Sequence, residues 1–166
     1  MDPTLPFRFK IRKTTEIDGS NVTSTSFRVH GYLQVDGDQL IVEWGGTAHV
    51  QHVGATGVRD ETEALPDERL AIPVADLYRA ELTGGWFRPR LTVQARRVGA
   101  LASLPSEHFG VADFWYDRSE RFTAIAVAQA LTEAIEHAAS TLLDGERDFS
   151  EGGAPRPPPG GTASAG

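Results

Sequence analysis

The stretch that decides the fold is residues 27–44, FRVHGYLQVDGDQLIVEW. Its first half alternates apolar residues with polar or charged ones: Phe27, Val29, Leu33 and Val35 against Arg28, His30, Tyr32 and Gln34. After the turn at 36–38, the alternation resumes with Leu40, Val42 and Trp44. A period of two indicates strands with one buried face, and an Asp-Gly turn between two such runs is typical of a β-hairpin. The sequence therefore predicts an antiparallel hairpin.

Working outward from this hairpin, short strand patterns continue along the chain. They are RLAIPV at 69–74, LYRAEL at 77–82, RPRLTVQARR at 88–97, VGALASL at 98–104 and VADFWYD at 111–117. This makes seven strands from Phe27 onward, and FRFKIRK at 7–13 adds an extra N-terminal one. We expect the Gly-, Thr- and acid-rich residues 45–68 to form a long connection with a mobile tip. Alternatively, AHVQHV at 48–53 extends the second strand.

After the strands, residues 120–143 predict one long helix, because no Gly or Pro interrupts them. Asp117 or Ser119 can cap its start. Its apolar residues fall on one stripe at helical spacing, which must pack on the sheet: Ala124, Val127, Ala128, Leu131, Ile135, Ala138 and Leu142. Glu133, Glu136 and His137 should face outward. The remaining residues, 144–166, are rich in Gly, Pro and Ser and predict a disordered tail.

The order of seven strands and one C-terminal helix resembles the pleckstrin-homology-like (PH-like) superfamily, and in particular its bacterial members. The similarity covers 27–143 and rests on element order and hydrophobic spacing. It implies a mainly β protein in which a seven-stranded antiparallel sandwich or partly open barrel is capped by the helix, so that 1–143 form one domain. PH-like domains that bind phosphoinositides carry a basic motif in their first hairpin turn. Here that turn is VDGDQ at 35–39, with two acids and no cation.

Composition excludes several classes of protein. A net charge of −7 and a pI near 5.2 argue against non-specific nucleic-acid binding. The absence of cysteine excludes disulfides, thiolate catalysis and cysteine-ligated zinc or iron–sulfur centres. No apolar run approaches the roughly 20 residues of a membrane helix, and the first residues lack the apolar segment of a secretory signal. We therefore expect a cytoplasmic protein. Arginine outnumbers lysine 14 to 2, as in GC-rich bacterial genomes.

No catalytic or metal motif is visible in the sequence. His49 and His52 would lie on opposite faces of a strand, a poor arrangement for sharing a metal ion. Asp113 lies inside an apolar strand pattern, so it should face solvent or meet an arginine. If the protein were an enzyme without a recognisable motif, a pocket near Asp113 and His108 would be needed. We predict no enzyme activity, no cofactor and no metal.

Two segments carry cations without acids and form candidate binding surfaces. Residues 3–15 contain Arg8, Lys10, Arg12 and Lys13, and residues 82–106 contain Arg88, Arg90, Arg96 and Arg97. Strand alternation places Arg8, Lys10 and Arg12 on one face, and Arg88, Arg90 and Arg96 on one face of another strand together with Trp86. The alternative interpretation is that these are solvated strand faces whose arginines pair with acids on neighbouring strands.

The glycine turn at 84–85 is followed at once by Trp86 and Phe87. One interpretation is structural, in which these aromatic side chains cover an open end of the barrel. The other is an exposed aromatic and arginine tip, a composition enriched in protein interfaces and at membrane surfaces.

The sequence thus predicts a binding or scaffold module that recognises a protein partner. Its binding residues would be Trp86, Phe87, Arg88 and Arg90, with Arg8, Lys10 and Arg12 as a second candidate surface. The alternative is a peripheral membrane module that binds anionic lipid headgroups. The oligomeric state is not indicated.

Overall fold

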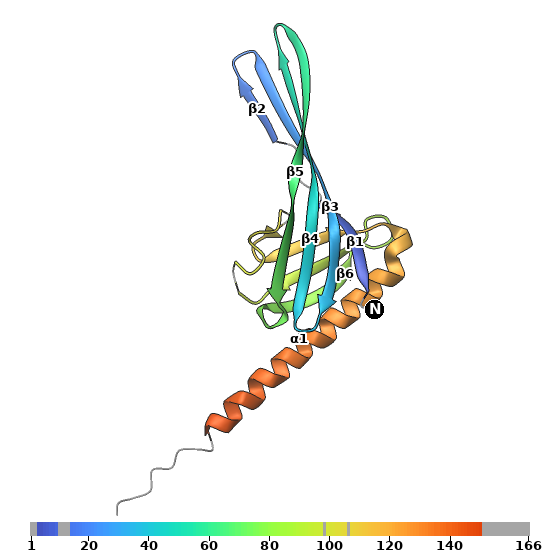
Figure 1. Ribbon diagram of the computed structural model, residues 1–166, viewed down its shortest axis with the longest axis vertical. Helices are drawn as coiled ribbons and strands as arrows, with labels where there is room; N and C mark the ends of the chain where they lie inside the picture. Colours follow the sequence, from blue (N-terminus) through green and yellow to red (C-terminus); the bar gives the residue numbers. More distant parts are fainter. Residues whose placement is uncertain (1–2, 10–13, 98, 106, 151–166) are drawn as a thin grey trace, which may run out of the picture.

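The computed structural model describes residues 3–9, 14–97, 99–105 and 107–150 of the chain (Figure 1). Its elements are β1 (Thr4–Phe9), β2 (Thr14–Asp18), β3 (Asn21–Asp36), β4 (Gln39–Gly54), β5 (Gly57–Pro73), η1 (Val74–Asp76), β6 (Leu77–Thr83), β7 (Arg90–Ala95), β8 (Glu107–His108), β9 (Val111–Trp115), η2 (Arg118–Glu120) and α1 (Arg121–Ser150). The protein is therefore mainly β with one C-terminal helix, as the sequence predicts.

The strands of the described residues form one antiparallel sheet in the order β5-β4-β3-β1-β9-β7-β6, with β2 attached to β3 and β8 attached to β9. The N-terminal strand β1 lies in the middle of this order. It pairs with β3 from Thr4 to Phe9 and meets β9 where Arg8 lies opposite Trp115. The extra strand is thus not an edge addition, because it joins the two halves of the sheet.

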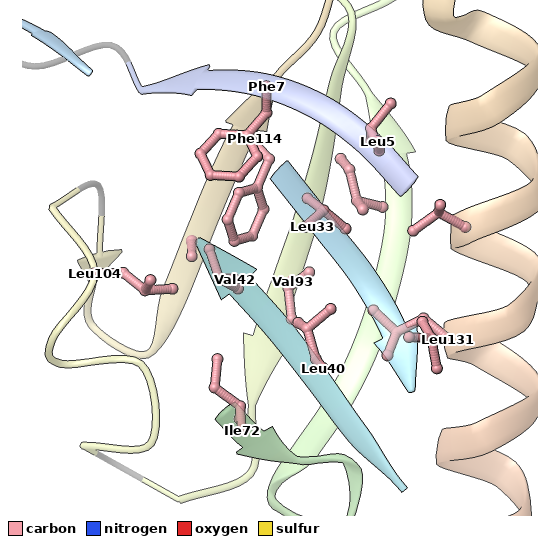
Figure 2. Close-up of a cluster of buried hydrophobic side chains, with 14 of the residues drawn as sticks. Leu5, Phe7, Leu33, Leu40, Val42, Ile72, Val93, Leu104, Phe114 and Leu131 are labelled. Atoms are coloured by element: carbon pink, nitrogen blue, oxygen red, sulfur yellow. The ribbon is translucent and has the colours of Figure 1, made fainter. Parts of the chain in front are cut away.

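The core lies where the sheet folds over on itself, so that β1, β3 and β4 face β7 and β9 (Figure 2). Leu33 and Val42 on one side and Val93 and Phe114 on the other are fully buried. The ring of Phe7 packs edge-on against Phe114 with 4.9 Å between ring centroids. Leu33 and Val42 are among the inward positions that the alternation in residues 27–44 predicts.

Helix α1 packs on β6, β1 and η1, and its C-terminal part extends past the body (Figure 1). The predicted stripe is buried from Ala124 to Ile135, whereas Leu142 is exposed. The helix continues to Ser150, so the end predicted at residue 143 is wrong. The predicted tail beyond Ser150 lies outside the described residues. In the part of the chain that the structure describes, no helix is both long enough and apolar enough to cross a membrane.

The largest correction concerns residues 45–68, which do not form a loop. They complete a long antiparallel hairpin, since β4 pairs with β5 from Gln39 to Gly54. The predicted extension through 48–53 is confirmed. The end of the returning strand falls in the strand predicted at 69–74, but residues 57–68 escaped prediction. Nearly every side chain from Gly57 to Arg69 is exposed, so this part of the sequence shows no alternation of apolar and polar residues.

A second correction concerns the strand expected at 98–104. The described residues there form consecutive turns, with hydrogen bonds from the amide of Ala102 to the carbonyl of Gly99 and from Leu104 to Leu101. Gly99 has a φ of +99°, which glycine adopts without strain. Leu101 and Leu104 are nevertheless buried, so the apolar pattern marks a core contact made by a loop.

Candidate binding site

The turn between β6 and β7 places two aromatic side chains at the surface. Gly84 and Gly85 have φ angles of +82° and +61°, both in the left-handed region that favours glycine. A side chain at Gly84 would overlap the carbonyl oxygen of Arg88. The chain therefore turns tightly here, and the next two residues, Trp86 and Phe87, remain 61% and 84% exposed. The interpretation that they cover the barrel end is wrong.

Two arginines, Arg118 of η2 and Arg121 at the start of α1, lie against these aromatic rings. The guanidinium carbon of Arg118 lies 5.3 Å from the ring centroid of Trp86 and 5.5 Å from that of Phe87. The guanidinium carbon of Arg121 lies 5.7 Å from the Trp86 centroid. These distances are within the range of cation–π interactions. Together with Phe122, which is 84% exposed, these residues form what we call the aromatic–arginine patch: Trp86, Phe87, Arg118, Arg121 and Phe122.

The aromatic–arginine patch borders a cavity of about 540 Å³. Its lining is mostly apolar, with two arginines and the hydroxyl-bearing residues Thr83 and Tyr116, and it includes no carboxylate: Leu82, Thr83, Gly85, Trp86, Pro89, Tyr116, Arg118, Arg121, Phe122 and Ile125. Neither Arg118 nor Arg121 forms an ion pair within the described residues. The site therefore offers two guanidinium groups and a hydrophobic surface to a ligand from outside the chain.

Tyr116 forms part of the inner wall of this cavity. Its side chain is buried, in contrast to the exposed aromatic rings at the rim. Burial raises the pKa of the Tyr116 phenol above its ordinary value, and the positive charge of Arg121 opposes this shift. The phenol is therefore neutral at physiological pH and can donate or accept a hydrogen bond.

Arg90, which the sequence places in the binding surface, is engaged in a structural network. Its Nη1 lies 3.1 Å from Asp113 Oδ2, and its Nε donates to Thr83 Oγ1 at 2.9 Å. Thr92 Oγ1 donates to Asp113 Oδ1 at 2.7 Å and lies 2.8 Å from Thr83 Oγ1. The guanidinium carbon of Arg90 also lies 5.2 Å from the Trp115 ring centroid. Asp113 meets an arginine, as expected.

The remaining residues of the predicted binding surfaces lie outside the aromatic–arginine patch. Arg88 is exposed on the turn, next to the patch in sequence. Arg8 Nη2 pairs with Asp117 Oδ1 at 3.1 Å, and both side chains are largely exposed. Arg8 and Arg90 lie opposite Trp115 from the two sides, so the two predicted basic stripes meet on one face of the sheet. Lys10 and Arg12 lie outside the described residues.

Sequence reasoning missed Arg118, Arg121 and Phe122. A signal was present, because Arg118 and Arg121 lie three residues apart where the chain enters the predicted helix. The sequence does not show which other segment of the chain lies beside these two arginines. The turn at 84–88 and the start of α1 are distant along the chain, and only the pairing of β7 with β9 brings them together.

The histidines considered for metal binding lie in separate surroundings. His49 and His52 lie on opposite faces of β4, as predicted, and they contact Thr62 and Thr23 respectively. His108 is exposed on β8 and packs edge-to-face against Phe109, with 4.3 Å between ring centroids. Among the described residues, no cluster of three or more His, Asp or Glu side chains is arranged to hold a metal ion.

The chain matches no protein-family model, no curated protein and no solved structure. The fold and the site therefore define only a structural class of protein. The chain is a mainly β protein with one C-terminal helix and an exposed patch of aromatic and arginine residues. The resemblance to PH-like proteins stays a prediction.

Proposed function

We propose that the chain is a non-catalytic binding or scaffold module of the bacterial cytoplasm that recognises a protein partner through the aromatic–arginine patch. The observation that supports this most directly is the position of Arg118. Its guanidinium lies between two exposed aromatic rings at the rim of a cavity whose walls contain no carboxylate. Tryptophan and arginine are the residues most enriched among those that dominate interface energies.

The chemistry of the patch indicates the kind of segment it would bind. Arg118 and Arg121 favour carboxylates, while Trp86, Phe122 and Ile125 offer apolar contacts beside them. A segment that presents acidic and aliphatic side chains together fits both requirements. Such a partner would insert a side chain into the cavity and place its carboxylates over the guanidinium groups.

A peripheral membrane module is the second candidate, because Trp86 and Phe87 are exposed beside arginines. Tryptophan and arginine are common at the headgroup level of membranes. However, membrane insertion needs a protruding surface, whereas Trp86 and Phe122 line a hollow. The concave shape favours a protein segment over a bilayer.

The test is affinity capture from native lysate with the wild-type chain, the double variant Trp86→Ala/Arg118→Ala and the control Arg96→Ala, an exposed arginine outside the cavity lining. We expect the wild type and the control to retain the same protein and the double variant to lose it, with all three unfolding at similar temperatures. Flotation with anionic vesicles that Trp86→Ala abolishes would instead identify a membrane module.

A further inference from the structure

The inner wall of the cavity beside the aromatic–arginine patch carries a hydroxyl group without a partner. Tyr116 lines this cavity and is only 5% exposed. Its backbone amide donates to the carbonyl of Pro89, but its hydroxyl has no hydrogen-bond partner among the described residues. The hydroxyl is not a wholly covered atom either, because among those residues only Ser24 Oγ is both covered and unpartnered. A molecule in the cavity can therefore reach the Tyr116 hydroxyl.

Positive charge faces the same space. Burial raises the pKa of the Tyr116 phenol and the charge of Arg121 opposes this shift, so the guanidinium group of Arg121 acts on the hydroxyl. Arg118 lines the cavity as well, and neither arginine forms an ion pair within the described residues. Three groups that can donate hydrogen bonds thus border one cavity: two guanidinium groups and one neutral phenol.

The acidic residues nearest in sequence do not neutralise these arginines. Asp117 Oδ1 lies 3.1 Å from the guanidinium of Arg8, and Glu120 Oε2 accepts a hydrogen bond from Thr123 Oγ1 at 3.3 Å. Neither acidic side chain lines the cavity. The chain as a whole carries a net charge of −7, yet the charged groups that line this cavity are both cationic. The cavity therefore favours an anion.

The rest of the lining favours an apolar group beside that anion. Leu82, Trp86, Pro89, Phe122 and Ile125 supply most of the surface. The volume of about 540 Å³ falls in the range of small-molecule sites, which combine apolar and aromatic walls with a few polar groups. A ligand that fits this lining has an anionic head and an apolar chain or ring.

We infer that the cavity binds a small amphipathic carboxylate, that is, a free organic acid with an apolar chain or ring. Its carboxylate would accept hydrogen bonds from the Tyr116 hydroxyl and the guanidinium groups, while its apolar part contacts Trp86 and Ile125. This inference goes beyond the proposed function, because it concerns a free small molecule, and either can hold without the other. A bound acid and a side chain inserted by a protein partner would exclude each other.

A carboxylate fits this lining better than the two alternatives. A neutral molecule would leave the charges of Arg118 and Arg121 without a partner, whereas a carboxylate pairs with a guanidinium group through two parallel hydrogen bonds. A phosphate monoester carries close to two negative charges at neutral pH. Its desolvation beside mostly apolar walls costs more than that of a singly charged carboxylate.

Isothermal titration calorimetry of the full chain tests this inference with four probes: octanoate, octanamide, acetate and octyl phosphate. Octanamide keeps the apolar chain of octanoate without its charge, and acetate keeps the carboxylate without the chain. We expect octanoate to bind at least about tenfold more tightly than octanamide, because its hydrogen bonds are made by a charged group. Acetate should give no measurable binding, and octyl phosphate should bind more weakly than octanoate.

Two variants place the binding in the cavity. Tyr116→Phe removes the hydroxyl but keeps the ring, and Arg121→Gln removes one charge. Each should weaken octanoate binding by about tenfold. Arg96→Gln changes the net charge equally at an exposed arginine outside the lining and should leave the affinity unchanged. Equal unfolding temperatures of the four proteins verify that the variants fold.

Three results would overturn the inference: octanamide that binds as tightly as octanoate, octyl phosphate that binds more tightly, or octanoate binding that is absent or survives both variants, the last meaning adventitious binding only. Failure of the proposed function is a separate result. A chain that captures a protein through Trp86 and Arg118 but does not bind octanoate retains that function. A chain that binds octanoate as expected but captures no protein retains only the inference made here.

Discussion

Arg90 Nη1 lies 3.1 Å from Asp113 Oδ2 on the outer face of the sheet, between β7 and β9. A charged aspartate in an apolar strand is thereby balanced by a cation on the next strand, and both side chains are partly buried. The pair belongs to a network with Thr83 and Thr92. Arg90 therefore stabilises the sheet, and Arg118 and Arg121 are the arginines available to a ligand.

Asp113→Ala should lower the free energy of unfolding by about 1 to 2 kcal/mol, because it leaves Arg90 and Thr92 without their acceptor. Arg90→Ala should cost a similar amount, and the double variant should cost less than the sum of both. Urea unfolding measures these values. Arg88→Ala serves as control, since Arg88 is exposed on the turn. Fully additive single effects would contradict a coupled pair.

Gly84→Ala should destabilise the protein more than Gly85→Ala. Both positions have positive φ angles, which cost about 1 kcal/mol for alanine. At Gly84 the added methyl group would also overlap the carbonyl oxygen of Arg88, while at Gly85 it meets no atom within 4 Å. Thermal unfolding of both variants measures the difference. Equal midpoints would mean that the turn relaxes around the methyl group.

The phenol of Tyr116 should ionise above its ordinary pKa of about 10, because burial disfavours the charged form. Its contribution to stability should be fully present below that pH and lost as the pH rises through the higher pKa of the folded state. Ultraviolet titration of the wild type, compared with Tyr116→Phe, isolates this group. Arg121→Ala should raise the pKa further, since the arginine stabilises the phenolate. A titration unaffected by Arg121→Ala would contradict their proximity.

Leu131→Ala should lower the free energy of unfolding by about 2 to 5 kcal/mol, because Leu131 is fully buried between α1 and the sheet. Leu142→Ala on the same helix stripe should change it by no more than about 0.5 kcal/mol, since Leu142 is exposed. Calorimetry or urea unfolding distinguishes these outcomes. A large loss with Leu142→Ala would show that the C-terminal part of α1 is covered in solution.

Amides at residues 22–26 of β3 should exchange with deuterium faster than those at 29–35. Both segments have ladder hydrogen bonds, but only the second lies over the core. Local opening is easier where few side chains are buried. Hydrogen exchange at low protein concentration measures the difference. Equal protection in a dilute sample would contradict the view that residues 22–26 of β3 are uncovered in solution.

The sequence predicts elements best where one face of a strand is buried. The alternation in residues 27–44 identified Val29, Leu33 and Val42 as core positions, and all are buried. The same logic missed the first part of β5, residues 57–68. There the side chains of β5 are solvated on both faces, so the strand is specified by its backbone pairing with β4 rather than by a hydrophobic pattern.

The sequence by itself determined the class of the fold, because burial imposes a period of two on strands and about 3.6 on helices. It also indicated Trp86 and Phe87 as candidate binding residues, but not Arg118, Arg121 or Phe122. Only the tertiary structure decided which arginines face the aromatic rings. Arg90 is drawn into the sheet by Asp113 on the neighbouring strand. Arg118 is brought to Trp86 by the folding of β7 beside β9. Both contacts join residues far apart along the chain, and pairing of this kind leaves no local trace in the sequence.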